Sequence, residues 1–211
     1  MAYLALVRHG QSEWNALGLW TGWRDVALSE KGHQDAKDAG KALKDITFDL
    51  GYTSALLRAQ QTLNDINVIL QQNFPVIKNQ ALNERDYGDL TGKNKWKIKE
   101  EYGEAQFLKW RRGWDDLLPN GESLKDVYER VVPYYEDEIL PHLKNGENVI
   151  IAAHGNSLRA LVKYLENVPD KDIPSLEIGL GEVYLYSIDA EGQMTNKEVR
   201  HATNPDTLPA K

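Results

Sequence analysis

The strongest constraint on the fold of this chain is a pattern that occurs twice, an apolar run that ends in His-Gly. Residues 3–7 form the first run and Arg8-His9-Gly10 follows it, while residues 149–153 form the second run and His154-Gly155 follows directly. A helix-like segment comes after each pair. Ligands of open α/β sheets bind at the carboxyl ends of the strands. The pattern therefore predicts that His9 and His154 face one pocket.

Strand-like and helix-like segments alternate along the chain, which predicts a three-layer α/β/α sandwich with a mostly parallel central sheet. Further strands are expected at 50–53, 183–188 and 194–199, with a weak candidate at 74–80.

Serine residues mark the expected starts of three helices, because a serine hydroxyl can accept a hydrogen bond from the first helical turn. Ser29 is expected to cap the first of these helices and Ser54 a helix over 55–72. Ser123 and Asp126 have the spacing of a capping box for a helix that runs to about residue 143, with a kink expected at Pro133.

The length of 211 residues suits one domain over 1–211, and the chain shows neither an internal repeat nor a linker. A charged, glycine-rich segment over 83–121, with helical signals that break at Gly103, is expected to be a cap-like insertion over the site. Residues 201–211 are expected to form a mobile tail, since they contain two prolines and few apolar side chains.

The composition excludes several classes of protein. With 25 Lys and Arg against 32 Asp and Glu, the net charge of −7 argues against general nucleic-acid binding, which needs a basic surface. Cysteine is absent, so disulfides, thiolate nucleophiles and Cys-ligated zinc are excluded. The chain begins without the features of a signal peptide and has no long apolar run, so a cytoplasmic protein is expected.

The residues near the two histidines suit a phosphoryl group. A neutral histidine nitrogen is a competent nucleophile, and Arg8 and Arg58 would match phosphate oxygens bidentately. Arg58 falls in the first turn of a predicted helix, where the helix dipole disfavours a cation, so an anion is expected beside it; an exposed surface arginine explains the position equally well. Gly10 and Gly155 would let backbone N–H groups approach the anion.

Arg8-His9-Gly10-Gln11-Ser12 resembles the signature of the histidine phosphatase superfamily, and the later motifs resemble its cofactor-dependent phosphoglycerate mutases. The resemblance covers almost the whole chain in the expected order. The later motifs lie at 21–23, 53–59, 82–88, 110–112, 120–124 and 153–159.

This resemblance implies a role for each matching residue. His9 would carry the phosphoryl group, Glu84 would be the general acid and base, and Arg8, Arg58 and His154 would surround the transferring group. The other implied contacts to phosphate or substrate are Gly10, Gln11, Ser12, Asn15, Thr21, Gly22, Arg85, Tyr87, Lys95, Arg111, Arg112, Gly155 and Asn156.

The implied reaction interconverts 3-phosphoglycerate and 2-phosphoglycerate, a step of glycolysis and gluconeogenesis, through a phosphohistidine and a 2,3-bisphosphoglycerate intermediate. The implied cofactor is 2,3-bisphosphoglycerate as primer, and no metal is expected because Arg and His supply the positive charge. The implied partners are small phosphoglycerates, with neither nucleic acid nor membrane. Relatives of this kind form homodimers or homotetramers, and small ones are monomers.

Some positions depart from the resemblance. Asp86 stands where many relatives have histidine, the segment between Arg112 and Asn120 is short, and the loop over 178–182 differs enough that no role is carried over to it. Rival functions are a phosphatase or a bisphosphoglycerate synthase on the same fold, or a non-catalytic binding module.

Two groups of site residues also have structural interpretations. Glu84 and Arg85 could pair on a loop surface. Arg111 and Arg112 could form a solvated helix face, because adjacent helical residues diverge by about 100° and reach one ligand only where the helix end is irregular.

Overall fold

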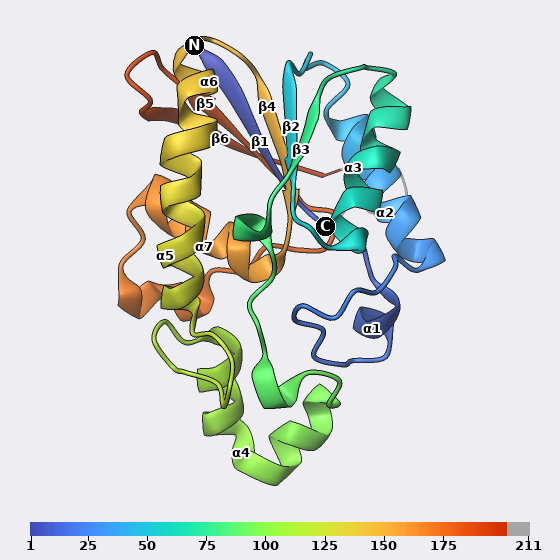
Figure 1. Cartoon of the computed structure of the whole chain (residues 1–211), viewed down its shortest axis with the longest axis vertical. Helices are drawn as coiled ribbons and strands as arrows, with labels where there is room; N and C mark the ends of the chain where they lie inside the picture. Colours follow the sequence, from blue (N-terminus) through green and yellow to red (C-terminus); the bar gives the residue numbers. More distant parts are fainter. Residues whose placement is uncertain (202–211) are drawn as a thin grey trace, which may run out of the picture.

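The centre of the protein is a mixed β-sheet (Figure 1). In this computed structural model residues 1–201 are described, and within them the sheet has six strands in the order β3-β2-β4-β1-β5-β6. Strands β3, β2, β4 and β1 are parallel, whereas β5 is antiparallel to both β1 and β6. The strands are β1 Ala2–Arg8, β2 Leu50–Thr53, β3 Val76–Lys78, β4 Val149–Ala153, β5 Val183–Ile188 and β6 Met194–Arg200.

Helices cover both faces of this sheet, which confirms the predicted α/β fold with a mostly parallel sheet. Helices α2 (Glu30–Ala42) and α3 (Leu57–Leu70) lie on one face, and α5 (Leu124–Tyr134), α6 (Leu140–Lys144) and α7 (Gly155–Glu166) lie on the other (Figure 1). Side chains of a strand alternate between the faces, so Leu4 and Leu6 join the α5–α7 core while Ala5 and Val7 join the α2–α3 core.

Helix starts follow the expected serine caps in two cases out of three. Ser29 accepts a hydrogen bond from the Gly32 N–H, and Ser123 forms the predicted capping box with Asp126. The prediction for Ser54 is wrong, because α3 begins at Leu57 without a side-chain cap. The Ser54 hydroxyl lies in the loop before α3, where it accepts a hydrogen bond from the Leu56 N–H.

The helix expected to run to about residue 143 is interrupted after Pro133 rather than kinked at it. Helix α5 passes through Pro133 and ends at Tyr134, a π-helical turn η3 spans Tyr135–Ile139, and α6 follows. Pro141 lacks an N–H and its ring crowds the carbonyl of the preceding turn. The wider π turn precedes this proline, and the Leu140 N–H there reaches back to the Tyr135 carbonyl.

The segment expected as an insertion forms the lower part of the molecule in Figure 1, beyond the sheet. It contains the short turn η2 (Gly88–Leu90) and α4 (Lys95–Arg112), which breaks at Gly103 where φ is 80°. A separate apolar cluster supports it: Trp20, Leu90, Ile98, Phe107, Trp110 and Leu118. Three short elements complete the structure, namely α1 (Glu13–Ala16), η1 (Gln80–Leu82) and η4 (Asp170–Ser175).

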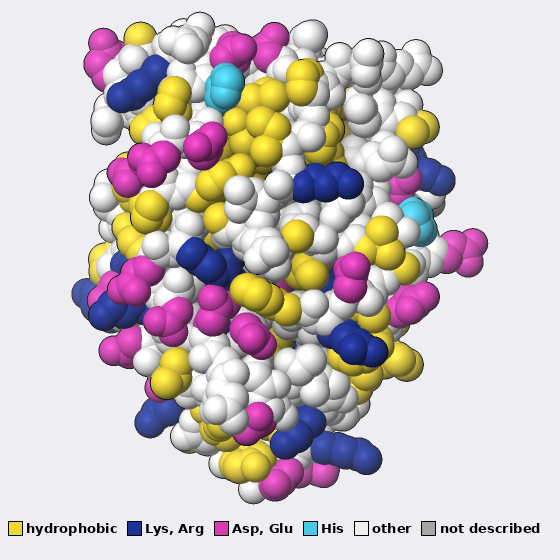
Figure 2. Space-filling model, in the orientation of Figure 1, with side chains coloured by type: hydrophobic (Ala, Val, Ile, Leu, Met, Phe, Trp, Pro, Cys, Tyr) yellow, Lys and Arg dark blue, Asp and Glu magenta, His cyan; other side chains and the backbone are white. Residues whose placement is uncertain are grey.

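The outer surface carries mixed charge. Figure 2 shows acidic and basic side chains interspersed over the face drawn there, with hydrophobic side chains gathered in its upper half. Among residues 1–201, every helix is too short or too polar to cross a membrane. Apart from His201, the expected tail over 201–211 lies outside the described residues.

Candidate active site

Parallel pairing brings the two His-Gly pairs to one edge of the sheet. Arg8 lies opposite Ala153 in the β1–β4 register, and the His9 N–H donates to the Ala153 carbonyl at 2.9 Å. The ring centroids of His9 and His154 are 5.0 Å apart. Both side chains are buried, with exposed fractions of 3% and 0%. The two histidines therefore lie close together at one edge of the sheet, as expected, but only His9 lines a pocket there, and His154 lines neither of the two pockets described below.

His9 is arranged as a nucleophile. Its Nδ1 lies 2.6 Å from the Gly10 carbonyl, which can only accept a hydrogen bond, so we place the proton on Nδ1 and the free lone pair on Nε2. Burial lowers the pKa of His9 well below its usual value, and the cations Arg58 and Arg8 lower it further. The ring is therefore neutral near pH 7 and keeps its lone pair.

His154 immediately precedes α7 and is its N-cap residue. Its Nε2 lies 2.7 Å from the Ser54 hydroxyl. Burial lowers the pKa of His154 well below its usual value, followed by the charge of Arg58. Ser54 contacts the site directly and was assigned only a capping role from the sequence. Its place just after β2, at the same edge of the sheet as the two histidines, is the signal that could have identified it.

Two guanidinium groups lie beside these histidines with unused donors. Arg58 donates to the Gly22 carbonyl at 2.8 Å and the Arg24 carbonyl at 3.1 Å, and Arg8 donates to the Ile178 carbonyl. Within residues 1–201 the Nε atoms of both arginines are buried without an acceptor. Burial lowers the pKa of Arg58 to about 10, which still leaves it charged at neutral pH. Both groups can therefore donate to an anion.

Glu84 faces the same pocket with its carboxylate held by two backbone donors. Its Oε1 accepts hydrogen bonds from the Arg85 N–H at 2.7 Å and from the Asn156 N–H at 3.2 Å, and only 7% of the residue is exposed. The loop-surface interpretation of Glu84 is therefore wrong, because the side chain is buried against the start of α7.

Two connected pockets open from this edge of the sheet. The inner pocket is lined by Arg8, His9, Asn15, Thr21, Arg58, Glu84, Tyr87 and Lys95. The outer pocket adds Trp20, Arg111, Arg112, Gly155, Asn156, Arg159, Glu177 and Ile178. A wider groove over α3 and β3 contains neither strand-end histidine. We therefore place the chemistry in the smaller, cationic pair.

The two ends of α4 supply cations to the outer pocket. Lys95 is the first residue of α4, and burial lowers its pKa to about 8, followed by the charge of Arg111. Arg112 is the last residue of α4, so the helix end lets it reach the pocket together with Arg111. Arg112 donates to the Glu177 carboxylate at 2.6 Å. The solvated-face interpretation of the two arginines is thus wrong.

Some expected phosphate contacts have other partners. The Gly10 N–H donates to the Thr62 hydroxyl at 3.2 Å, and a Cβ on Gly10 would lie 2.1 Å from the Gly32 carbonyl oxygen, so close approach of α2 explains this glycine. The Gln11 N–H donates to Asp35, and Ser12 caps α1. None of the three expected residues lines either pocket.

Arg85 also departs from the expected arrangement. It is fully buried behind the pockets, where its guanidinium donates to the Trp110 carbonyl and lies 5.1 Å from the centre of the Tyr87 ring. Arg85 therefore supports Tyr87 rather than lining the site. Gly22 acts through its carbonyl, which accepts from Arg58.

Arg159 is a site residue that the sequence reasoning missed. Its guanidinium donates to the Asn156 side-chain oxygen at 2.9 Å, and the Asn156 amide donates to the Tyr87 hydroxyl at 2.9 Å. Burial lowers the pKa of Arg159 to about 10. Its place at the end of the motif over 153–159 was the available signal.

Comparisons with known proteins identify the family of the chain. A family model described as histidine phosphatase superfamily (branch 1) matches residues 4–199. A Mesorhizobium japonicum protein named 2,3-bisphosphoglycerate-dependent phosphoglycerate mutase is 50% identical over 199 residues, covering 93% of this chain and 97% of its own. A Cytophaga hutchinsonii protein of the same name is 47% identical over 194 residues, with 90% of each chain covered.

Solved structures show the same fold. A mycobacterial glucosyl-3-phosphoglycerate phosphatase in complex with VO3 superposes with a TM-score of 0.81 at 25% identity, covering 94% of this chain and 97% of its own. The Bacillus stearothermophilus protein YhfR superposes with a TM-score of 0.80 at 28% identity, covering 92% and 95%.

Proposed function

The chain belongs to the histidine phosphatase superfamily, and we propose that it is a phosphoglycerate mutase that works through phospho-His9. Relatives about half identical over nearly their whole length carry that name, which supplies the substrate class. The observation that carries the proposal is the pair of pockets: the inner one holds a neutral His9 and Glu84, and the outer one holds a second set of cations. A phosphoglycerate has two anionic groups that need such an arrangement.

The residues present fit 2,3-bisphosphoglycerate as the primer. Buried Nε atoms of Arg8, Arg58 and Arg159 and the Thr21 hydroxyl have no acceptor among residues 1–201, which leaves several donors for phosphate and carboxylate oxygens. The role of 2,3-bisphosphoglycerate is to supply the phosphoryl group that first loads His9. No metal is needed in this proposal, because arginine and lysine side chains supply the positive charge.

In the first half-reaction Glu84 accepts the proton of the 2-hydroxyl of 3-phosphoglycerate. That oxygen forms a bond to phosphorus while the bond between phosphorus and His9 Nε2 breaks, which returns a neutral His9. Arg8, Arg58 and His154 surround the equatorial oxygens, where the charge of the transition state is spread. The proton on His9 Nδ1 stays on that nitrogen throughout, and Nδ1–H donates to the Gly10 carbonyl.

In the second half-reaction the bound 2,3-bisphosphoglycerate has reoriented in the site, and His9 Nε2 attacks its other phosphoryl group. The bond from phosphorus to the 3-oxygen breaks, and Glu84 returns its proton to that oxygen. The products are 2-phosphoglycerate and phospho-His9. The outer cations hold the group that is not reacting in each half, which keeps the molecule bound while it turns.

A phosphatase on the same fold is the alternative, and the structural relatives include one that acts on a glucosyl-3-phosphoglycerate. Water would then discharge phospho-His9. The outer cluster of Lys95, Arg111, Arg112 and Arg159 favours the mutase, because it retains a second anionic group. A bisphosphoglycerate synthase would share both pockets and is separated from the mutase by assay.

We further propose that the 211 residues form a single cytoplasmic domain of glycolysis and gluconeogenesis, with residues 83–121 as its cap. Phosphoglycerates are the proposed partners.

The test is a coupled enolase assay on wild type, His9→Ala and His142→Ala, with and without 2,3-bisphosphoglycerate and with EDTA present. His142 is the control, since it pairs with Glu147 on the surface. We expect primer-dependent formation of 2-phosphoglycerate that is lost only in His9→Ala. Release of phosphate that outpaces isomer formation would make the protein a phosphatase, and net accumulation of 2,3-bisphosphoglycerate would make it a synthase.

A further inference from the structure

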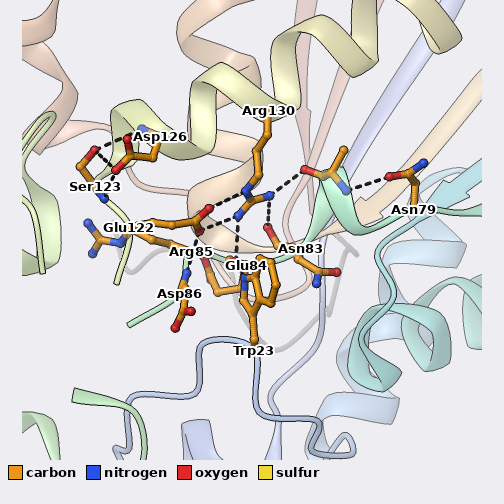
Figure 3. Close-up of polar contacts among 11 residues, drawn as sticks. Trp23, Asn79, Asn83, Glu84, Arg85, Asp86, Glu122, Ser123, Asp126 and Arg130 are labelled. Carbon is orange, nitrogen blue, oxygen red and sulfur yellow. Dashed lines mark hydrogen bonds and ion pairs between the residues drawn. The ribbon is translucent and has the colours of Figure 1, made fainter. Parts of the chain in front are cut away.

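We propose that Arg130 is the positioning residue for Glu84, acting through the backbone of the segment that carries this carboxylate. The inference rests on the proposed role of Glu84 as general acid and base. Arg130 projects from α5 toward residues 81–84, as Figure 3 shows, and it lines neither pocket. It therefore acts on the reaction only through other residues.

The guanidinium of Arg130 uses its full donor capacity, on the backbone of residues 81–84 and on the Glu122 carboxylate. It donates to three carbonyls, those of Ala81 at 2.7 Å, Asn83 at 3.0 Å and Glu84 at 3.0 Å. Its other two bonds go to the two carboxylate oxygens of Glu122, at 2.8 and 2.9 Å. A guanidinium has five N–H donors, so all of them are engaged.

Glu122 holds the backbone on the other side of Glu84, at Asp86. Its Oε2 accepts from the Asp86 N–H at 2.8 Å, and its own N–H donates to the Asp86 carbonyl at 2.9 Å. The Trp23 indole N–H donates to the Glu84 carbonyl at 2.6 Å (Figure 3). The backbone on both sides of Glu84 is therefore held by side chains from other parts of the chain.

The Glu84 segment depends on these side chains because it belongs to no regular helix or strand. It lies between η1 and η2, so neighbouring strands or helical turns do not supply donors to its carbonyls. Buried carbonyls need a donor, and Arg130 provides it at three of them. Loss of Arg130 would leave the Ala81 and Asn83 carbonyls without their donor, and the Glu84 carbonyl would keep only the Trp23 indole N–H. The segment would then shift to reach other donors.

A shift of this segment would impair proton transfer more than anion binding. The Glu84 carboxylate must lie within hydrogen-bond reach of the substrate oxygen, and a displacement of about 1 Å can cost about 100-fold in rate. The cations that hold the substrate belong to α3, α4, α7 and the end of β1, and Arg130 contacts none of them through the hydrogen bonds described above. Loss of Arg130 should therefore lower kcat, most strongly for substrates with poor leaving groups, and should leave the affinity for substrate almost unchanged.

Leaving-group dependence separates this role from a purely structural one. A poor leaving group, such as the alkoxide of a glycerate phosphate, needs a proton from Glu84 as it departs. A good one, such as p-nitrophenolate, leaves without it. Misplacement of Glu84 therefore slows transfer from the first kind of donor to His9 and spares transfer from the second. A general loss of folded enzyme slows both equally.

The experiment compares Arg130→Met, Arg130→Lys, Glu122→Gln and Glu84→Gln with wild type. Single-turnover phosphorylation of His9 is measured with 2,3-bisphosphoglycerate and with p-nitrophenyl phosphate, together with steady-state isomerisation. Arg200→Met is the matched control, since Arg200 also donates to a backbone carbonyl and two carboxylates, at the edge strand β6.

We expect Arg130→Met to lower kcat for isomerisation by about 100-fold and to leave KM within about threefold, with p-nitrophenyl phosphate reacting at nearly the wild-type rate. Arg130→Lys should resemble Arg130→Met, because a lysine has three N–H donors for five acceptors. Glu122→Gln should lie between these variants and wild type, and Arg200→Met should match wild type with both donors.

Equal losses with both phosphoryl donors in Arg130→Met would overturn the proposal and leave Arg130 a structural residue. Full activity in Arg130→Lys would also overturn it, since charge alone would then suffice. Glu84→Gln distinguishes the two levels of the argument. If it shows no leaving-group dependence, the role of Glu84 itself fails. If it shows this dependence and Arg130→Met does not, only the positioning role fails.

Discussion

Replacing Glu177 with glutamine is expected to tighten the binding of 3-phosphoglycerate and to leave kcat unchanged. The Glu177 carboxylate lies in the outer pocket and accepts a hydrogen bond from Arg112 at 2.6 Å, the same cation that is proposed to hold a substrate anion. Arg112 lowers the pKa of Glu177, so this carboxylate is charged at neutral pH. A substrate anion must displace it before it can use Arg112 fully.

The size of the effect follows from the exposure of this ion pair. The Glu177 side chain is 59% exposed, and exposed pairs contribute about 0.2–1 kcal/mol. At about 1.4 kcal/mol per tenfold change, release of Arg112 should lower KM by about 1.4- to 5-fold. Because Glu177 does not contact His9 or Glu84, the gain applies equally to the ground state and the transition state, and kcat stays constant.

The assay is the steady-state isomerisation rate at low and high salt, with Asp170→Asn as control. Asp170 pairs with Lys163 and is 63% exposed, and its loss changes the net charge equally. We expect KM to fall only in Glu177→Gln, with a difference that shrinks as salt screens the charges. An unchanged or higher KM in Glu177→Gln would refute the reasoning, and an equal fall in the control would assign the effect to overall charge.

Three further predictions follow from buried groups. Lys95, with a pKa of about 8, loses its charge as pH rises through that value, so KM for 3-phosphoglycerate should rise on the alkaline side in wild type and stay level in Lys95→Arg. The lowered pKa of His154 means that the unfolded chain binds its proton below about pH 6.5 while the folded chain does not. His154 should therefore contribute about 1.4 kcal/mol per pH unit to the fall in the free energy of unfolding below that point. His154→Asn should remove this contribution, as measured by urea titration, while the contribution of His9 stays. Gly10→Ala should lower the free energy of unfolding by roughly 1–3 kcal/mol, because the new Cβ would lie 2.1 Å from the Gly32 carbonyl oxygen. Gly179→Ala is the control, since its new Cβ would have its nearest contact at 3.6 Å, and the same urea titration should show no change.

Each of these predictions has an outcome that contradicts it. A parallel rise of KM in Lys95→Arg would place the alkaline titration elsewhere. An identical acid slope in His154→Asn would mean that His154 takes up its proton in the folded state. Wild-type stability in Gly10→Ala would show that α2 moves away at little cost.

Much of the site could be predicted because its main residues follow short local patterns. An apolar run predicts a buried strand, and the residue that follows such a strand lies at the carboxyl edge of the sheet. His9 and His154 could therefore be placed together from the sequence. The motifs added Glu84, Tyr87, Lys95 and Arg112, which the structure brings to the connected pockets.

What only the tertiary structure decided depends on distances between segments far apart in the chain. The proton on His9 Nδ1 follows from the carbonyl beside it, and Ser54 pairs with His154 because β2 lies next to β4. Arg85 turns away from the pocket, whereas Arg130 reaches the backbone of Glu84 from another helix. A sequence pattern states which side chains share an edge or a face, but hydrogen-bond partners are set by packing to within an ångström, and that packing involves the whole chain.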